Sequence, residues 1–305
     1  MTPTATRGEP VDPEVRSALR IQVSSARAAA PALAIAGSDR KNAVLAQVAE
    51  LLQERNTTIV EANGKDLVTA REAGRSESFL DRLELTPERI TALAESLSDV
   101  IALPDPIGEV MNESLQPSGL RVGRVRVPLG LIASIYESRP NVTIDIAALC
   151  LKSGNACVLR GGREAVNSNT LLAAIVTDAL TANGLPGEAV QLIRNPDRTL
   201  VAELLRLNDL IDLIVPRGGK PLIERVRDEA HRFAITTHRA KRAREITASP
   251  LDEIEGVCAK RKKALLLHFG SARNVARAGR ADLEAVGGIS KAIAEKIYGH
   301  FHIDQ

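Results

Sequence analysis

The sequence predicts an α/β protein with a doubly wound parallel sheet, N-terminal helices and a β-ribbon, followed by a small all-α domain. Apolar strands alternate with helices between residues 129 and 219, helical periodicity precedes that segment, and a helical pattern repeats after it. Strand–helix alternation is typical of a parallel sheet covered by helices on both faces. We expect a disordered N-terminus (1–13), an α/β domain (14–226), a helical linker (227–248) and a tandem helical domain (249–305).

Helices are expected first, because apolar residues recur at three- and four-residue spacing in residues 14–33, 38–74 and 86–103. Thr86 and Pro87 supply a cap and a first-turn proline for the last of them. Residues 108–130 then alternate with period two around Pro117-Ser118-Gly119, which predicts a β-ribbon.

Strands and helices alternate from Leu129 onward. Apolar strands are expected within 129–137, 155–162, 189–193 and 210–219, separated by helices within 141–154, 167–184 and 197–209. Four parallel strands of this kind bind ligands beyond their carboxyl ends. A helix after Gly219 is expected to reach about Thr247, although Ile235-Thr236-Thr237 weakens its middle.

Composition indicates an ordinary cytoplasmic protein. Hydrophobic residues make up 44% and charged residues 26% of the chain, no apolar run is long enough to span a bilayer, and the N-terminus lacks a signal-peptide pattern. Three irregularly spaced cysteines predict neither disulfides nor a metal site. Cys150 and Cys157 fall in apolar patterns and are expected to be buried structural thiols.

Charge is distributed unevenly along the chain. Residues 227–305 hold 15 Lys and Arg against 10 Asp and Glu, whereas residues 1–226 hold 25 against 28. All five histidines also lie after residue 226. The second part is therefore basic enough to meet a polyanion.

Glycine turns follow two of the predicted strands. Main-chain N–H groups in such turns, with the following helix N-terminus, suit an anion. Many α/β proteins carry structural glycines there, so an ordinary turn remains the alternative. The candidate cofactor-binding residues are Arg160, Gly161, Gly162 and Arg163 after one strand and Pro216, Arg217, Gly218 and Gly219 after the other.

A helical pattern repeats in residues 251–270 and 283–301. Each copy reads Leu-x-x-hydrophobic-x-Gly-hydrophobic-x and then continues as a helix, which predicts two packed hairpin units. Ser249-Pro250 is expected to begin the first helix. Cys258 stands where Ser290 stands in the other copy, and it is expected to weaken the first turn if a positive φ is required there.

Residues 14–226 resemble γ-glutamyl phosphate reductase, a glutamate-5-semialdehyde dehydrogenase of the aldehyde dehydrogenase superfamily. The resemblance rests on VGRVRVPLGLIASIYESRPNVTIDIAALCLKSGNACVLRGG and LIDLIVPRGGKPLIERV. It implies oxidoreductase chemistry with NADP(H) in proline biosynthesis. It also implies that Arg160–Gly162 and Pro216–Gly219 line the cofactor, and that Asn141 stabilises an oxyanion.

The resemblance also implies a catalytic cysteine in a substrate domain downstream of the matched segment. The Cys-Asn-x-x-Glu-like surroundings of that thiol occur nowhere in this sequence. We therefore assign no catalytic residue and expect cofactor binding without reductase turnover. The alternative is an active glutamate-5-semialdehyde dehydrogenase that reduces γ-glutamyl phosphate with NADPH through another nucleophile or a partner chain.

Residues 227–305 resemble the C-terminal part of the nuclease component of excinuclease ABC, a nucleotide-excision-repair enzyme with a tandem helix–hairpin–helix domain. The matching strings are RDEAHRFAITTHR, SPLDEIEGVCAKRKKALLLHFGS and DLEAVGGISKAIAEKIYGHF. His231 falls on a catalytic histidine of that family, but its acidic partners have no counterpart, so we expect no catalysis there.

The second resemblance and the hairpin pattern together imply DNA binding through the phosphate backbone. The candidate DNA-binding residues are Gly256, Val257, Lys260 and Arg261 in the first hairpin and Gly288, Ile289, Ser290 and Lys291 in the second. A solvated charge run is the alternative for the first set.

The two resemblances together predict a fusion of two truncated families, an incomplete α/β sheet and a helical tail, joined near Val226-Arg227. A natural fusion, a frameshifted or rearranged gene, and an assembly artefact would each give this junction. The first resemblance implies further strands beyond the matched segment, so the α/β part is expected to expose a sheet edge that permits self-association. If it binds no cofactor, the α/β part is only a scaffold.

Overall fold

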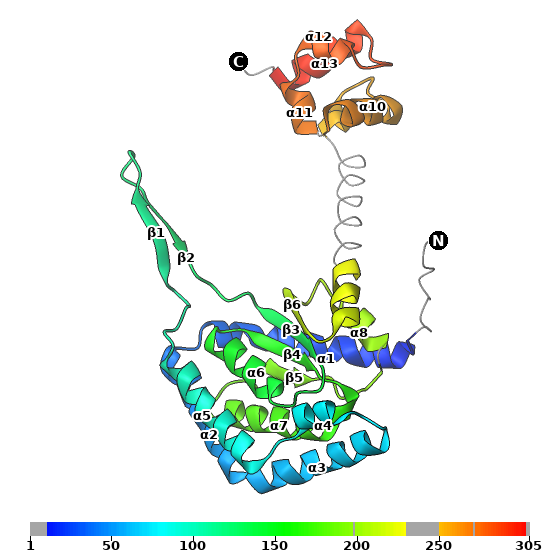
Figure 1. Cartoon of the computed structure of the whole chain (residues 1–305). Helices are drawn as coiled ribbons and strands as arrows, with labels where there is room; N and C mark the ends of the chain where they lie inside the picture. The colour runs from blue at the N-terminus through cyan, green and yellow to red at the C-terminus, as the bar shows by residue number, and fades with distance from the viewer. Residues whose placement is uncertain (1–10, 198, 230–249, 271, 303–305) are drawn as a thin grey trace. The chain divides into compact units, whose positions relative to one another are not determined.

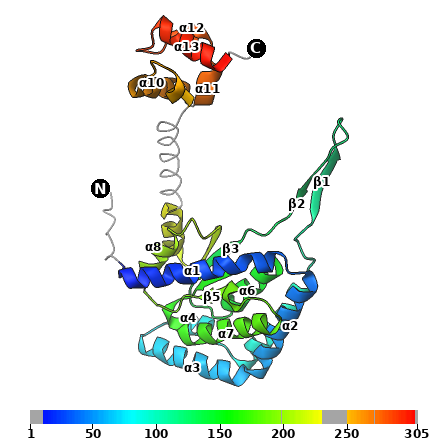
Figure 2. The same ribbon diagram turned by 180° about the vertical axis from the view of Figure 1, so that it is seen from behind.

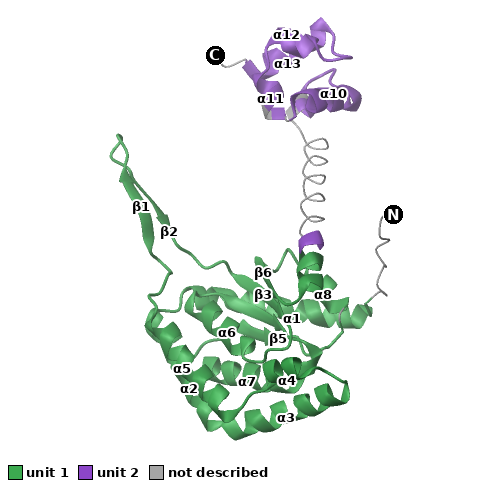
Figure 3. Cartoon of the chain, in the orientation of Figure 1, with its two compact units in different colours: residues 1–226 green, residues 227–305 purple. Residues whose placement is uncertain are grey.

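The chain divides into two compact units, residues 1–226 and residues 227–305 (Figure 3). A computed structural model describes residues 11–197, 199–229, 250–270 and 272–302. The expected disordered N-terminus is wrong for residues 11–13, because Val11 is buried in the core and α1 begins at Pro13. Residues 1–10, most of the expected helical linker, Ser249 and His231 lie outside the described residues.

Unit 1 is built on a four-stranded parallel sheet, as the sequence predicts. Its order is β5-β4-β3-β6, from β3 (Leu131–Tyr136), β4 (Ala156–Arg160), β5 (Val190–Leu192) and β6 (Leu213–Arg217). Every residue of β3 and β4 is buried, which explains their continuous apolar runs. β6 lies at one edge of the sheet in the part of the chain that is described.

Helices cover both faces of this sheet (Figures 1 and 2). α1 (Pro13–Ala34) and α8 (Thr199–Leu204) pack together on one face, whereas α6 (Val142–Lys152) and α7 (Val166–Ala182) lie on the other. This two-faced cover is the doubly wound arrangement that the alternation of strands and helices predicts.

An outer helical layer packs against α6 and α7. It contains α2 (Ser38–Glu54), α3 (Asn56–Glu72), α4 (Glu77–Leu83) and α5 (Pro87–Ala102). The helical periodicity of residues 38–74 does not reveal the break at Arg55. The backbone of Arg55, with φ −98° and ψ 15°, is not helical, so α2 ends there. Next to that break, Asn56 donates to the Pro87 carbonyl at the start of α5. α4 is also absent from the predicted elements.

The predicted β-ribbon consists of β1 (Val110–Leu115) and β2 (Arg121–Val125), paired antiparallel. It extends away from the rest of unit 1 (Figure 1). Nearly all of its residues are exposed, and the exposed side chains include Leu115 and Val125. The ribbon therefore adds little to the core of unit 1.

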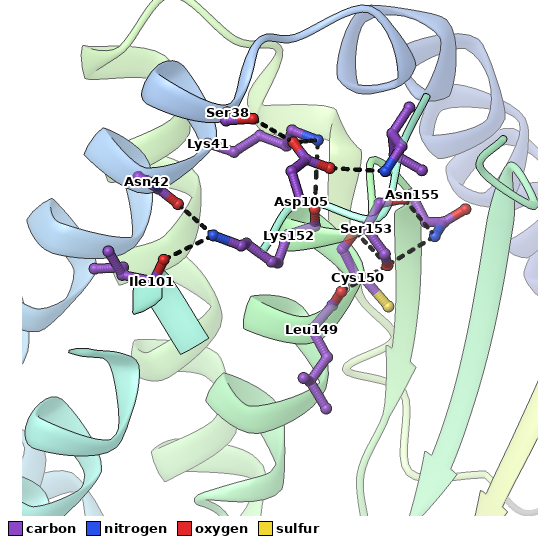
Figure 4. A network of polar contacts seen from close by, with 11 residues as sticks. Ser38, Lys41, Asn42, Ile101, Asp105, Leu149, Cys150, Lys152, Ser153 and Asn155 are labelled. Atoms are coloured by element: carbon purple, nitrogen blue, oxygen red, sulfur yellow. Dashed lines mark hydrogen bonds and ion pairs between the residues drawn. The ribbon is translucent and has the colours of Figure 1, made fainter. Parts of the chain in front are cut away.

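A buried polar network joins α2 to α6 and to the loop after α5 (Figure 4). Lys41 is 1% exposed, and its Nζ lies 2.6 Å from Oδ2 of Asp105. The Nζ of buried Lys152 donates to Asn42 Oδ1 and to the Ile101 carbonyl, both at 2.8 Å. Both ammonium groups have partners, which offsets the free-energy cost of burying them.

Unit 2 is helical. It contains η3 (Pro250–Glu253), α10 (Ala259–Phe269), α11 (Ala272–Arg277), α12 (Arg280–Glu284) and α13 (Lys291–His302). Residues of both sequence repeats share one core, including Leu251, Leu265, Leu283 and Ile297. The element at Pro250 is a short 3-10 helix rather than the expected longer helix.

Candidate functional site

Three loops of unit 1 meet at the carboxyl edge of the sheet. β3 lies between β4 and β6, so the loops after these strands are neighbours. Glu164, after β4, accepts hydrogen bonds from the main-chain N–H (2.8 Å) and hydroxyl (3.2 Å) of Ser138, after β3. Gly219, after β6, donates its N–H to Glu137 at 3.3 Å. Both acceptors are carboxylates, so side chains as well as strand pairing fix the edge.

A cavity of about 320 Å³ opens at this edge. Four arginines contribute to its lining: Arg75, Arg160, Arg163 and Arg225. Two carboxylates, Glu137 and Glu164, also line it, and apolar walls come from other residues, among them Phe79, Val201, Pro221 and Leu222. Basic groups beside apolar walls suit a ligand that carries both phosphates and a flat ring system.

Arg160 is buried in the wall of this cavity. Its Nη2 donates to the carbonyls of Pro196 (2.9 Å) and Asp197 (3.3 Å), and its Nη1 donates to the Gly161 carbonyl. Its guanidinium therefore holds the loop after β5 against β4. By contrast, Arg75, Arg163 and Arg225 are exposed around the cavity.

The glycines at the two turns of unit 1 are required by close neighbours. A Cβ on Gly161 would lie 2.1 Å from Nδ2 of Asn169, and one on Gly162 would lie 2.0 Å from Oε1 of Glu164. On Gly218 it would lie 2.8 Å from both Glu137 and Leu222, whereas on Gly219 it would meet only Pro221, at 3.6 Å. At Gly161 the neighbour is the amide of buried Asn169, whereas at Gly162 and Gly218 the ends of flexible side chains would have to shift.

The cavity contains only part of the predicted cofactor set. Arg160, Gly162 and Arg163 line it, but Gly161 and Pro216–Gly219 do not. The helix at 220–229 supplies Pro221, Leu222 and Arg225 instead. Arg225 follows the glycine turn at a spacing that helical geometry could have indicated, whereas Arg75 comes from the turn between α3 and α4 and carries no sequence signal.

Asn141 lies at the start of α6, in a separate hollow. Its Nδ2 donates to Oδ2 of Asp145 at 3.0 Å. Burial raises the pKa of Asp145, while the charge of Arg217 and the Asn141 hydrogen bond act in the opposite direction. The Asn141 amide is thus held by Asp145, and it does not line the cavity at the sheet edge.

Neither cysteine of unit 1 lines the cavity at the sheet edge. Cys150 and Cys157 are buried, as the sequence predicts. A hydrogen bond with Cys150 and burial raise the pKa of the Cys157 thiol, which disfavours its nucleophilic thiolate form. Cys258 is exposed in unit 2, where the main-chain N–H of Arg261 is the largest cause that lowers its pKa.

The two predicted turns of unit 2 have matching geometry. Gly256 and Gly288 have φ values of +95° and +89°. In the first turn the N–H of Val257 donates to the Ile254 carbonyl, and in the second Ile289 donates to Val286, both at 3.1 Å. Each turn leads into a helix of more than ten residues, α10 or α13.

Cys258 does not strain the first turn in the way that the sequence suggested for a positive φ. Its φ is −71°, so the position needs no glycine, and the positive φ belongs to Gly256 two residues earlier. Lys260, Ser290 and Lys291 are exposed at the starts of their helices, as a phosphate contact requires. Lys262 is instead buried, with its Nζ 2.5 Å from Asp252.

Two further kinds of site are absent from the part of the chain that is described. No group of three or more His, Cys, Asp or Glu side chains is placed to hold a metal ion. No helix there combines the length and apolarity needed to cross a bilayer.

The chain belongs to the aldehyde dehydrogenase family, whose model matches residues 14–239. The match includes residues 227–239, so the family likeness extends beyond the predicted limit at residue 226 and across RDEAHRFAITTHR.

Its relatives include γ-glutamyl phosphate reductases. The protein of that name from Photorhabdus laumondii is 50% identical over 206 residues, which are 68% of this chain and 49% of the relative. The one from Nitratidesulfovibrio vulgaris is 51% identical over 70% of this chain and 51% of its own length. The chain spans about half the length of the curated relatives it matches.

Solved structures of γ-glutamyl phosphate reductases are also similar to this chain. The γ-glutamyl phosphate reductase of Thermotoga maritima is 44% identical, with a TM-score of 0.68 over 69% of this chain and 51% of that chain. The one from Saccharomyces cerevisiae is 35% identical, with a TM-score of 0.64 over 69% of this chain and 54% of that chain.

Proposed function

We propose that unit 1 binds NADP(H) in the cavity at the carboxyl edge of the sheet. The observation that carries the proposal is the convergence of Arg75, Arg163 and Arg225 on one cavity with apolar walls. Guanidinium groups pair with phosphates, and doubly wound sheets bind dinucleotides at this edge. The lining thus fits the cofactor's phosphates and adenine. Arg160 has a structural role, because it holds the loop after β5 against β4.

A titration of NADPH into the whole chain, followed by cofactor fluorescence, tests this proposal. Arg163→Glu should weaken binding on the order of tenfold, or about 1.4 kcal/mol, because it places a negative charge beside the phosphates. Arg40→Glu changes an exposed arginine of α2 by the same charge and should leave the affinity unaltered. Equal affinities in all three proteins would place the cofactor elsewhere, and no binding by the native chain would leave unit 1 as a scaffold.

We further propose that this chain does not by itself reduce γ-glutamyl phosphate to glutamate semialdehyde, the step in proline biosynthesis that its relatives imply. A thiol mechanism needs a nucleophile over the cofactor, but the unit 1 cysteines, Cys150 and Cys157, are buried and do not line the cavity, and Cys258 belongs to unit 2. An NADP-dependent glutamate-semialdehyde dehydrogenase assay should give no rate above a no-enzyme control. Turnover that one Cys→Ser change abolishes would instead support an active reductase.

Unit 2 carries a second proposed function, namely DNA binding by a tandem helix–hairpin–helix domain like that of the excinuclease ABC nuclease. The supporting observation is the pair of matching turns at Gly256 and Gly288, each leading into a helix with an exposed lysine, Lys260 or Lys291. Main-chain N–H groups and lysines at helix starts suit phosphates and carry no base readout. We therefore expect salt-dependent binding with little sequence preference, and a role in nucleotide excision repair is the physiological setting that this likeness implies.

Fluorescence anisotropy of the whole chain with two unrelated duplexes, at several salt concentrations, tests the DNA proposal. Lys260→Glu and Lys291→Glu should weaken binding to both duplexes alike and flatten the salt slope, because fewer counterions are released. Arg277→Glu, outside both turns, is the charge-matched control. Salt-independent binding, or none at low salt, would refute the proposal.

A further inference from the structure

Arg261 joins the two turns of unit 2. Its Nη1 donates to the carbonyl of Gly256 in the first turn at 2.8 Å. Its Nε donates to the carbonyl of Gly288 in the second turn at 3.2 Å. One guanidinium thus holds the two positive-φ glycines, which are far apart in the sequence but equivalent in the repeat.

A second contact links the turns in the reverse direction. Ile293 occupies the position in the second repeat that Arg261 occupies in the first, 32 residues later. A Cβ on Gly256 would lie 2.7 Å from Cδ1 of Ile293, so this side chain packs directly on the first turn. Each repeat therefore contacts the turn of the other, once through hydrogen bonds and once through apolar packing.

The chemistry of the link favours arginine specifically. A guanidinium offers several N–H donors in a rigid plane, so two can reach different carbonyls at once. An ammonium is a compact group on a flexible stem and cannot reproduce that fork. The sequence predicts that Arg261 contacts DNA, but these hydrogen bonds direct it towards the main chain of the turns.

We propose that Arg261 is a positioning residue that fixes the separation and orientation of the two phosphate-binding turns, so that one duplex engages both together. This inference rests on the proposed DNA binding by unit 2. Two linked contacts bind more tightly than either alone because the second forms within the complex already made. Loss of the link should therefore lower affinity even when the net charge is unchanged.

The test compares duplex binding by the native chain, Arg261→Lys and Arg277→Lys, using anisotropy across a salt series. Arg261→Lys keeps the charge but cannot hold both carbonyls, so duplex affinity should fall on the order of tenfold and the salt slope should become shallower. Arg277→Lys makes the same chemical change outside the turns and should match the native chain. The salt slope counts phosphate contacts, so a role confined to stability would not change it while the tail stays folded.

Thermal unfolding accompanies each variant. If Arg261→Lys unfolds unit 2, Ile293→Val is the deciding variant. It shortens the side chain that packs on the first turn without altering charge or hydrogen bonds. It should also lower the duplex affinity and make the salt slope shallower. A folded Arg261→Lys protein with native duplex affinity and salt slope would overturn this inference but not the proposed DNA binding. If Arg261→Lys unfolds, native affinity and slope in Ile293→Val would have the same meaning. Absence of duplex binding by the native chain would overturn the proposed function and this inference with it.

Discussion

Glycine turns occur in both units, but the physical causes differ between Gly161, Gly162 and Gly218 of unit 1 and Gly288 of unit 2, while Gly256 combines a φ of +95° with a neighbour 2.7 Å from a Cβ. A Cβ on Gly161, Gly162 or Gly218 of unit 1 would lie within 2.8 Å of a neighbouring side chain, although none of these glycines has a positive φ. Gly288 of unit 2 has open space around it and a φ of +89°. A glycine beside a candidate phosphate site therefore reports close packing in the first case and backbone conformation in the second.

Unlike the glycines, the two arginines that contact these turns have the same role in both units. Arg160 and Arg261 both donate to main-chain carbonyls, although the sequence predicts a ligand contact for each. Exposed neighbours, Arg163 in one unit and Lys260 in the other, are the groups left facing solvent. Arg160 and Arg261 thus hold the main chain of their turns, and the exposed Arg163 and Lys260 are the better candidates for the ligand.

The largest expected effect tests whether the two units are stable independently. Asp105→Ala should destabilise unit 1 by about 3 kcal/mol, because it leaves the buried Lys41 ammonium without its carboxylate. Chemical denaturation should show an earlier transition for unit 1 and an unchanged one for unit 2. Asp209→Ala, which breaks the exposed pair with Arg20, should cost less than about 1 kcal/mol. Equal losses in the two variants would show that the buried network contributes no more than a surface pair.

The next effect concerns close packing in unit 1. Gly161→Ala should cost about 2 kcal/mol, because its Cβ would overlap Asn169. Gly219→Ala, which meets only Pro221 at ordinary contact distance, is the control and should change stability by less than about 0.5 kcal/mol. The measurement is urea denaturation of both variants. A Gly161→Ala protein as stable as the control would contradict the packing explanation.

A smaller effect is expected from backbone conformation in unit 2. Gly288→Ala should cost about 1 kcal/mol, because an L-residue is disfavoured at φ +89° even in open space. Gly287→Ala has equally open surroundings and no positive φ, so it should be nearly neutral. Thermal unfolding of the tail in the two variants separates them, and identical midpoints would remove the distinction drawn between the units.

The smallest expected effect is a difference in thiol reactivity between the cysteines of the two units. Only Cys258 should react with iodoacetamide in the native chain, because Cys150 and Cys157 are buried. The main-chain N–H of Arg261 lowers the pKa of Cys258, so its alkylation rate should rise with pH at lower pH than that of free cysteine. Mass spectrometry gives the labelled site, and Cys258→Ser should abolish native labelling. A profile displaced to higher pH would contradict this description of the turn.

The sheet was predictable from the sequence because its strands are buried on both faces. The continuous apolar runs of β3 and β4, bounded by glycine turns, leave few other interpretations. The break at Arg55 and the short α4 were not predictable, because a continuing helical period does not show where tertiary packing redirects the chain.

The candidate sites were predictable only in part. The repeat identified Gly256 and Gly288, since the same backbone conformation requires the same residue. Arg75 and the carbonyl contacts of Arg160 and Arg261 depend on residues distant in sequence, which local patterns do not reveal.

The most direct test of the central claim, that the two units bind separate anionic ligands, is calorimetric titration of NADPH into the whole chain with and without saturating duplex DNA. Saturable binding with the same affinity in both titrations is the predicted result, because the cofactor residues and the hairpin residues lie in different units. Absence of NADPH binding, or its loss when duplex is present, would contradict the claim.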